Sequence, residues 1–204
     1  MPALGWKFGL RGARYRSMKH LLVADLEATC SNDGSVPRDA METIEIGAVM
    51  VSAENQQPVD EFQSFVRPVR HRKLTDFCCE LTSIRQADVD SAPLFPVAFA
   101  DFLAWAGRFP GHVFCSWGDY DPGQLQQDCT HHGVAYPFGD RHINLKAEFA
   151  AAQGRRRKSG LAGALKQVGL SFSGSHHRGI DDARNIVRLL PFIFPPDNGT
   201  ADAS

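Results

Sequence analysis

The sequence predicts an α/β protein in which helices flank a mixed β-sheet. Three stretches typical of strands come first and are joined by short connections, as in an antiparallel meander. After them, apolar residues recur at helical spacing, and the helices that they predict alternate with short apolar strands. A meander followed by such units is typical of a mixed sheet with helices packed on it.

The first half of the chain predicts the three strands of the meander. Residues 20–28 are mostly apolar, and residues 29–41 carry the Gly, Pro, Asn and Asp of a loop. The stretch ETIEIGAVMVS (42–52) is apolar and β-branched, and EFQSFVRPV (61–69) alternates polar and apolar residues until Pro68. These features predict strands over 20–28, 42–52 and 61–69.

The second half predicts helices separated by short strands. Residues 81–92 predict a short helix and turn. Residues 95–108 predict a longer helix, whose apolar residues at helical spacing are Val97, Phe99, Phe102, Leu103, Trp105 and Ala106. The remaining patterns predict, in chain order, a strand over 112–117, a helix over 122–133, a strand over 142–145 and helices over 161–170 and 181–194.

Length, charge and cysteine content restrict the class of protein. The 204 residues, of which 43% are hydrophobic, suffice for one globular domain with its own core. The net charge of −1 excludes a polybasic protein that coats DNA, but it is compatible with a nucleic-acid enzyme that has a local basic rim. Five cysteines without a CxxC spacing predict neither a disulfide framework nor a structural zinc site, so we expect a reducing, cytoplasmic setting.

The chain is expected to contain one domain, over residues 18–194, between two polar ends. Residues 1–17 carry Lys and Arg but no acid, and we expect a disordered arm there rather than a transit peptide. Met18 is an alternative natural start, because it opens directly into the first strand. Residues 195–204 are expected to form a disordered tail. No apolar run approaches the roughly 20 residues that span a bilayer, so no membrane segment is predicted.

Two carboxylates interrupt the apolar first strand, in the stretch LLVADLEATC. Because side chains alternate between the faces of a strand, Asp25 and Glu27 share one face and lie about 7 Å apart. Unpaired carboxylates so placed in a core would repel each other and lose hydration, so a positive charge is expected between them. A Lys or Arg would supply it, and so would a hard divalent cation such as Mg²⁺ or Mn²⁺. A solvated strand end with ordinary charges is the alternative.

A second acidic pair lies in SHHRGIDDARNIVRLL (175–190). Helical periodicity places Asp182 on one stripe with apolar residues of the following turns, so its carboxylate is expected to face the core. Asp181 falls on a polar stripe and is expected to cap the helix. His177, five residues before Asp182, is placed to take a proton at neutral pH. His176 is the competing histidine, and an ordinary surface role is the alternative for either.

The stretch CSWGDYDPGQL (115–125) follows a predicted strand and opens a helix. Asp121 precedes Pro122, a pattern that suits a helix N-cap followed by Pro at the first helical position. Asp121 is therefore either a cap alone or a third functional acid, and Asp119 is the alternative acid.

Together these motifs resemble the DEDDh branch of the DnaQ-like 3′–5′ exonucleases. The likeness rests on DLEATC, on SWGDYD leading into a helix and on HHRGIDDARNI. Within that branch the chain is most similar to the ERI-type exoribonucleases, with which it shares a segment like DFCCELTSIRQADVDSAP. The resemblance covers about residues 19–192. It implies a ribonuclease-H-like fold, which is a five-stranded mixed sheet flanked by helices.

The resemblance also implies a role for each matching residue. Asp25 and Glu27 match the first motif, Asp121 the second and Asp182 the last, and these acids would hold two Mg²⁺ or Mn²⁺ ions about 3.5–4 Å apart. His177 would be the general base that deprotonates the attacking water. The product would be a nucleoside 5′-monophosphate.

Contacts to the terminal nucleotides are expected from backbone groups, a hydroxyl and aromatic rings. The candidates are Leu26, Ala28, Phe77, Thr82, Trp117 and Tyr120. Core packing is the alternative for the rings. Basic runs over 67–73 and 155–158 are expected either to track phosphates or to be solvated loops.

The expected substrate is the 3′ end of single-stranded RNA, with DNA possible and protein partners left open. A non-catalytic RNA-binding module on this fold, a DNA exonuclease and a small-molecule phosphatase are the rival functions. The non-catalytic rival would be favoured by loss of an acid or of the histidine, and none is lost in this sequence.

Overall fold

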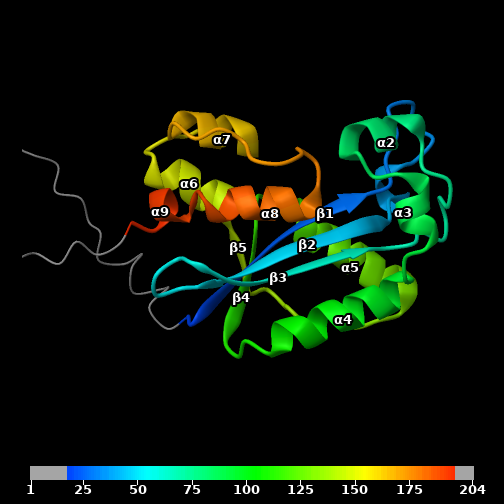
Figure 1. Ribbon diagram of the computed structural model, residues 1–204, viewed down its shortest axis with the longest axis horizontal. Coiled ribbons are helices and arrows are strands. Elements are labelled where there is room, and N and C mark those ends of the chain that lie inside the picture. Colours follow the sequence, from blue (N-terminus) through cyan, green and yellow to red (C-terminus); the bar gives the residue numbers. More distant parts are fainter. Residues whose placement is uncertain (1–17, 196–204) are drawn as a thin grey trace, which may run out of the picture.

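The computed structural model describes residues 18–195 and contains a five-stranded mixed sheet (Figure 1). The strands are β1 (His20–Ala28), β2 (Thr43–Ser52), β3 (Pro58–Phe65), β4 (His112–Ser116) and β5 (His142–Asn144). They lie in the order β3-β2-β1-β4-β5. The first three pair antiparallel, whereas β4 pairs parallel with both β1 and β5. The predicted meander and mixed sheet are confirmed.

Helices cover both faces of this sheet. They are η1 (Arg38–Ala40), α2 (Asp76–Thr82), α3 (Gln86–Asp90), α4 (Phe95–Gly107), α5 (Tyr120–His132), α6 (Leu145–Ala152), α7 (Leu161–Gln167), α8 (Gly179–Val187) and α9 (Leu190–Ile193). Figure 1 shows α4 and α5 on one face, and α6 to α9 on the other. α2 and α3 lie beside the end of the sheet where β1 ends. Within residues 18–195, no helix has the length and apolar character needed to cross a bilayer.

The alternation of β1 divides the core into two layers. Leu22, Ala24 and Leu26 pack with apolar residues of α4 and α5. Leu21 and Val23 pack on the other face with residues of α6 to α9. The predicted alternation is therefore confirmed, and the face that continues into the two acids of β1 is the one that α8 covers.

The third predicted strand differs from the structure at both ends. β3 begins at Pro58 and ends at Phe65, so it starts and stops earlier than the predicted strand over 61–69. Residues 81–92 contain the short helix and turn that were predicted, because α3 lies within this stretch. α2 ends at the start of this stretch, and Ser83, in the left-handed conformation at φ 58°, turns the chain before α3 begins.

The helix predicted over 181–194 is also divided. α8 starts earlier, at Gly179, and a separate short helix α9 follows, because Pro191 lacks the N–H that would continue the helical ladder. Val97, expected on the apolar stripe of α4, is instead 55% exposed. The predicted arm, residues 1–17, and residues 196–204 of the predicted tail lie outside the described residues.

Candidate active site

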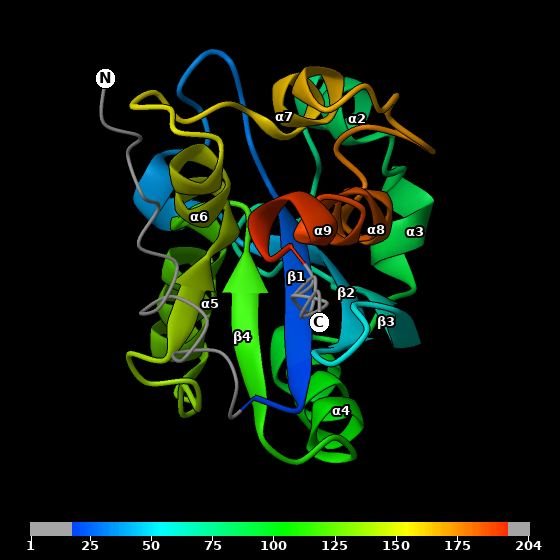
Figure 2. The same cartoon turned by 90° about the vertical axis from the view of Figure 1, so that its left-hand side faces the viewer.

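The candidate active site lies at the edge of the sheet where β1 ends. β1 and β4 run parallel, so their carboxyl ends meet at this edge (Figure 2). Asp25 and Glu27 stand near the end of β1, on the face that α8 covers, and Glu27 is only 8% exposed. The chain leaving β4 enters α5 at the same edge, so a third acid from α5 can reach the first two.

α5 begins earlier than its sequence pattern predicted. Its first residue is Tyr120 and its N-cap position belongs to Asp119, so Asp121 lies inside the first turn and is not the N-cap. The buried Asp121 carboxylate reaches across to β1 instead, where Oδ1 accepts the Leu26 N–H at 3.0 Å. This bond fixes the third carboxylate against the backbone that joins the two acids of β1.

α8 lies close against β1 and β2 because two glycines let the backbones touch. A Cβ atom on Gly47 would overlap the backbone of Gly179, and a Cβ on Gly179 would press against the Asp25 carbonyl oxygen. This contact lowers the first turn of α8 onto the acidic end of β1. Asp182, in that turn, is 4% exposed, as its position on the apolar stripe predicted.

The neighbouring Asp181 has a different role from its predicted one. The N-cap position of α8 belongs to Arg178, so Asp181 does not cap the helix. Its Oδ2 accepts the Ser175 N–H at 2.9 Å, and its Oδ1 pairs with Arg184 at 3.0 Å. Asp181 therefore fastens the preceding loop to α8.

His177 is the histidine that the structure brings to the acids. Its backbone N–H donates to Asp182 Oδ2 at 2.9 Å. Potential ligand atoms of the side chains of Glu27, His177 and Asp182 all lie within 4.8 Å of one another. The backbone of His177 is left-handed, at φ 60°, which is uncommon for a residue other than glycine. His176 makes an edge contact with Phe172, with ring centroids 5.0 Å apart, and is not part of this cluster.

Burial raises the pKa values of all four carboxyl groups, and repulsion from neighbouring acids adds to it in Asp25, Glu27 and Asp182. Burial is the largest cause in each case. The pKa of Glu27 rises to about 9, with Asp182 and Glu45 adding to it, and that of Asp182 rises to about 7. The pKa of Asp121 rises to about 6, and that of Asp25 lies well above its usual value. Without a cation, the site therefore retains protons near neutral pH.

The donor set fits divalent metal ions. Among residues 18–195, no Lys or Arg forms an ion pair with any of the four carboxylates, so the alternative of a bridging side chain is not realised. Oδ1 of Asp182 is buried and accepts no hydrogen bond from the protein. Such an oxygen is costly to leave unsatisfied, and a hard cation would satisfy it.

We expect the metal-free protein to lose stability as the pH rises from about 5 to about 9. The four folded-state pKa values lie above the unfolded values of 3.8 and 4.5, so the folded state holds more protons in this window. Burial lowers the pKa values of His177, His132 and His142 below 6.5 and acts in the opposite sense, but the shifts of the four acids are the larger ones.

Thermal unfolding in EDTA at several pH values measures this dependence. Saturating Mg²⁺ or Mn²⁺ should remove most of the slope, because the bound cation offsets the repulsion between the carboxylates. A melting temperature that rises with pH across the window in EDTA would contradict the prediction.

Sequence analysis missed a fifth acid, Glu45. It lies on β2 opposite Glu27 and is fully buried. Its Oε1 accepts from Gln63 Nε2 at 2.6 Å, and its Oε2 accepts from Arg178 Nε at 3.0 Å and from Gly179 N at 3.2 Å. The signal was present in ETIEIGAVM, where this acid stands within an apolar strand in the same way as the acids of β1.

The polar groups predicted to contact substrate are mostly engaged elsewhere. The Leu26 N–H is bonded to Asp121, and the Leu26 side chain lies on the opposite face of the sheet, as expected. The Ala28 carbonyl accepts a 3.7 Å bond from the Cys78 thiol. Thr82 is buried, and its hydroxyl donates to the Cys78 carbonyl at 2.8 Å inside α2.

The three predicted rings surround the same edge of the sheet. Trp117 is partly buried, and its Nε1 donates to the Ser159 carbonyl at 3.2 Å. Tyr120 is 38% exposed beneath the guanidinium of Arg38, which lies 4.4 Å from the ring centroid. Phe77 is half-buried on α2. Trp117 therefore packs in part on the core, and its stacking on a base stays a prediction.

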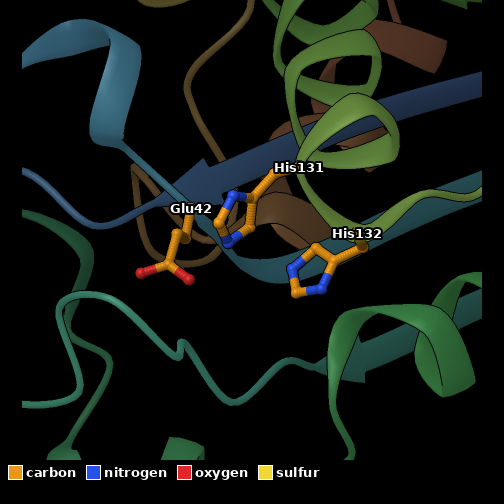
Figure 3. Close-up of side chains that lie close together, drawn as sticks. All are labelled: Glu42, His131 and His132. Atoms are coloured by element: carbon orange, nitrogen blue, oxygen red, sulfur yellow. The ribbon is translucent and has the colours of Figure 1, made fainter.

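A second cluster of potential metal ligands has a structural explanation. Figure 3 shows Glu42, His131 and His132, whose ligand atoms lie within 4.8 Å of one another. The buried Glu42 carboxylate already accepts three backbone N–H groups of residues 69–71, each at 2.8 Å. His132 stacks on Phe95, with ring centroids 5.2 Å apart. Glu42 therefore anchors the loop that carries the basic run over 67–73.

Comparison with known families agrees with this arrangement. Residues 22–190 match the family model described as exonuclease, RNase_T. The chain belongs to this exonuclease family. The match includes β1 from Leu22 onward, the other four strands and all four acids with His177, and the fold of DEDDh exonucleases implies divalent metal ions.

Individual relatives agree with the ERI-type resemblance. ERI1 exoribonuclease 2 of Homo sapiens is 34% identical over 192 residues, which cover 83% of this chain and 28% of that protein. The nuclease domain of 3′hExo, a DEDDh family member bound to rAMP, superposes with a TM-score of 0.79 at 29% identity and covers 84% of this chain and 90% of that one. The predicted membership of the DEDDh, ERI-type group is thereby confirmed.

A further solved structure superposes with a TM-score of 0.78 at 28% identity. It describes the 3′-end specific recognition of histone mRNA stem-loop by 3′-exonuclease. It covers 84% of this chain and 62% of that chain. The present chain spans only about three-tenths of the length of the curated relatives named ERI1 exoribonuclease 2 in human and mouse, 28% and 29% respectively.

Proposed function

We propose that residues 18–194 form a metal-dependent 3′–5′ exonuclease that releases nucleoside 5′-monophosphates from single-stranded RNA or 3′ overhangs. One observation carries this proposal: four carboxylates and one imidazole, from segments far apart in the chain, converge on the end of β1. The groups are Asp25, Glu27, Asp121, His177 and Asp182. A non-catalytic module on this fold has no need to keep four repelling acids together.

The proposed cofactors are two Mg²⁺ or Mn²⁺ ions, held by Asp25, Glu27, Asp121 and Asp182. Such ions, when bound, offset the charge of the phosphate and favour deprotonation of water. His177 is the proposed general base. Burial lowers its pKa below 6.5, so its imidazole is neutral at pH 7 and able to accept the proton of the attacking water.

RNA is the proposed polymer. The relatives that are similar over most of this chain are named exoribonucleases, and one related 3′-exonuclease was solved with a histone mRNA stem-loop. A contact to the 2′-OH would discriminate RNA from DNA. We propose a cytoplasmic setting, which is supported by five cysteines that are all free thiols.

We propose the loop between α6 and α7 as a track for the phosphates of the bound strand. Residues 155–158 are four consecutive Arg and Lys residues that line a surface cavity of about 560 Å³. No carboxylate of residues 18–195 forms an ion pair with them. The bond from Trp117 to the Ser159 carbonyl joins this loop to the segment that leads into Asp121. Figure 2 shows the loop at the end of the sheet where β4 ends.

Asp121 and Asp119 are expected to differ strongly when replaced. Asp121→Asn should abolish most cleavage, because its buried carboxylate lies against β1. Asp119→Asn should be mild, since Asp119 makes no capping bond and stays outside the cluster. Initial rates on a 5′-labelled RNA, with unfolding temperatures as the control for folding, measure both. The reverse ranking would move the third ligand to Asp119.

A time course on a 5′-labelled oligonucleotide tests the proposed function. We expect a ladder that shortens from the 3′ end of single-stranded RNA, slower digestion of matched DNA, slow digestion of a blunt duplex and no activity in EDTA. The metal site at the sheet edge must reach the terminal phosphodiester, and a paired end must first be unstacked.

Three control substrates, which are circular RNA, matched DNA and p-nitrophenyl phosphate, separate this proposal from its rivals. Cutting of a circular RNA, or internal cuts at the earliest times, would contradict an exonuclease. Faster digestion of DNA would contradict the RNA assignment alone and favour the DNA exonuclease. Hydrolysis of p-nitrophenyl phosphate without RNA digestion would favour a small-molecule phosphatase.

A further inference from the structure

An ion pair with one fully buried partner lies next to the candidate active site. Arg178 Nε donates to Glu45 Oε2 at 3.0 Å, and the Glu45 carboxylate is fully buried. The guanidinium of Arg178 also lies over the Phe65 ring, with its central carbon 5.2 Å from the centroid. Arg178 is therefore tied to both β2 and β3 by its side chain.

The same residue follows a tightly held turn and holds the N-cap position of α8. Arg178 follows His177 directly, and the His177 backbone is left-handed at φ 60°. Within the turn that precedes Arg178, the backbone N–H of Ser175 donates to Asp181 and that of His177 donates to Asp182, each at 2.9 Å. These two bonds tie the turn to α8, whereas the Arg178 side chain and the adjacent Gly179 N–H, which both donate to Glu45 Oε2, tie it to the sheet on which the acids of β1 stand.

α8 itself does not depend on that ion pair for its position. The glycine contact between Gly47 and Gly179 sets its distance from the sheet, and buried apolar residues of α8, namely Ile180, Ala183 and Ile186, hold it on the core. The position of Asp182 is therefore fixed by the helix, whereas the position of His177 depends on the turn.

We propose that Arg178 is a positioning residue for His177. Its ion pair with Glu45 holds the backbone of the turn, so that the His177 imidazole stays beside the carboxylates in the orientation that proton transfer requires. This inference rests on the proposed exonuclease function. Because a misplacement of about 1 Å can cost about 10²-fold in rate, loss of the pair should affect turnover more than binding.

The test compares four variants with the unmodified chain, and Arg178→Lys is one of them. Arg178→Met removes the charge but keeps the packing over Phe65. The double variant Glu45→Gln/Arg178→Met removes the buried charge as well, and the amide oxygen that it introduces is still able to accept the Gly179 N–H. Arg108→Met is the matched control, because Arg108 also pairs with an acid, Asp60 at 2.6 Å, and lies near a ring, but far along the chain at the end of α4.

We expect both Arg178→Met variants to lower kcat about 10- to 100-fold, as for a misplaced reacting group, while KM for RNA and the Mn²⁺ dissociation constant change less than about 3-fold. Arg178→Lys should restore part of kcat, since an ammonium also pairs with Glu45. In metal-free protein, the ring NMR signals of His177 should broaden or shift in Arg178→Met and stay unchanged in Arg108→Met.

Three outcomes would overturn the inference. An unchanged kcat in the double variant would show that the pair is a purely structural contact. The double variant also serves if Arg178→Met alone fails to fold because Glu45 is left unpaired. A raised KM with unchanged kcat would assign Arg178 to RNA binding. Equal losses in Arg108→Met would show a general effect on the fold. Failure of the proposed function is distinct, because the unmodified chain would then not shorten RNA.

Discussion

Replacing Asp182 by Asn should lower turnover on single-stranded RNA at least ~10²-fold, as for the loss of a metal ligand in a two-metal site. The Asp182 carboxylate is 4% exposed, and Asn keeps one oxygen that accepts the His177 N–H. The substitution therefore removes the charge that binds the cation without opening a cavity. Asp25→Asn should have an effect of the same size, because Asp25 stands in the same cluster of repelling charges.

The fold should survive both changes. The pKa of Asp182 is raised to about 7 by burial, so in EDTA at pH 8 its charge is unfavourable and Asn should leave the melting temperature equal or higher. Asp181→Asn is the matched control, one residue away, and should keep turnover within a few-fold because Asn still accepts the Ser175 N–H. Asp182→Asn or Asp25→Asn protein that cleaves at the rate of the unmodified chain would show that the site is wrongly assigned.

Replacing His177 should slow cleavage by about 10²- to 10⁴-fold, the usual contribution of a general base. Metal and RNA binding should persist, because the proposed base acts on water and is not proposed as a ligand. The backbone of His177 is left-handed, so His177→Asn, which tolerates this conformation, should be compared with His177→Ala. Similar losses in both variants would assign the effect to the imidazole rather than to the backbone.

His176→Ala is the control for the neighbouring ring and should retain most of the turnover. The pH profile adds a second readout. Burial and the adjacent His176 lower the pKa of His177 below 6.5, so the rate should fall only as the pH drops below that value. Removing His176 should move this acid limb to slightly higher pH. A crippled His176→Ala protein beside a normal His177→Ala protein would identify the other histidine as the base.

Local periodicity was sufficient for the parts of the site that lie on one element. Alternation along β1 put Asp25 and Glu27 on one face, and the helical stripe put Asp182 toward the core, and both placements agree with the structure. The strands of the sheet were predictable for the same reason, because the spacing of apolar residues and the turn residues between them are local features of the sequence. The choice of Asp121 over Asp119 and of His177 over His176 needed the family resemblance as well.

Only the tertiary structure decided the contacts between elements. It placed Asp121 inside the first turn of α5, engaged the Thr82 hydroxyl within α2, and joined Glu45 to Arg178 across 133 positions of sequence. No local pattern encodes such contacts, because strand register and helix docking depend on close packing of backbones, as at Gly47 and Gly179. The sequence by itself determined which acids and histidines are candidates for the chemistry, and the docking of α8 on the sheet decided which of them meet.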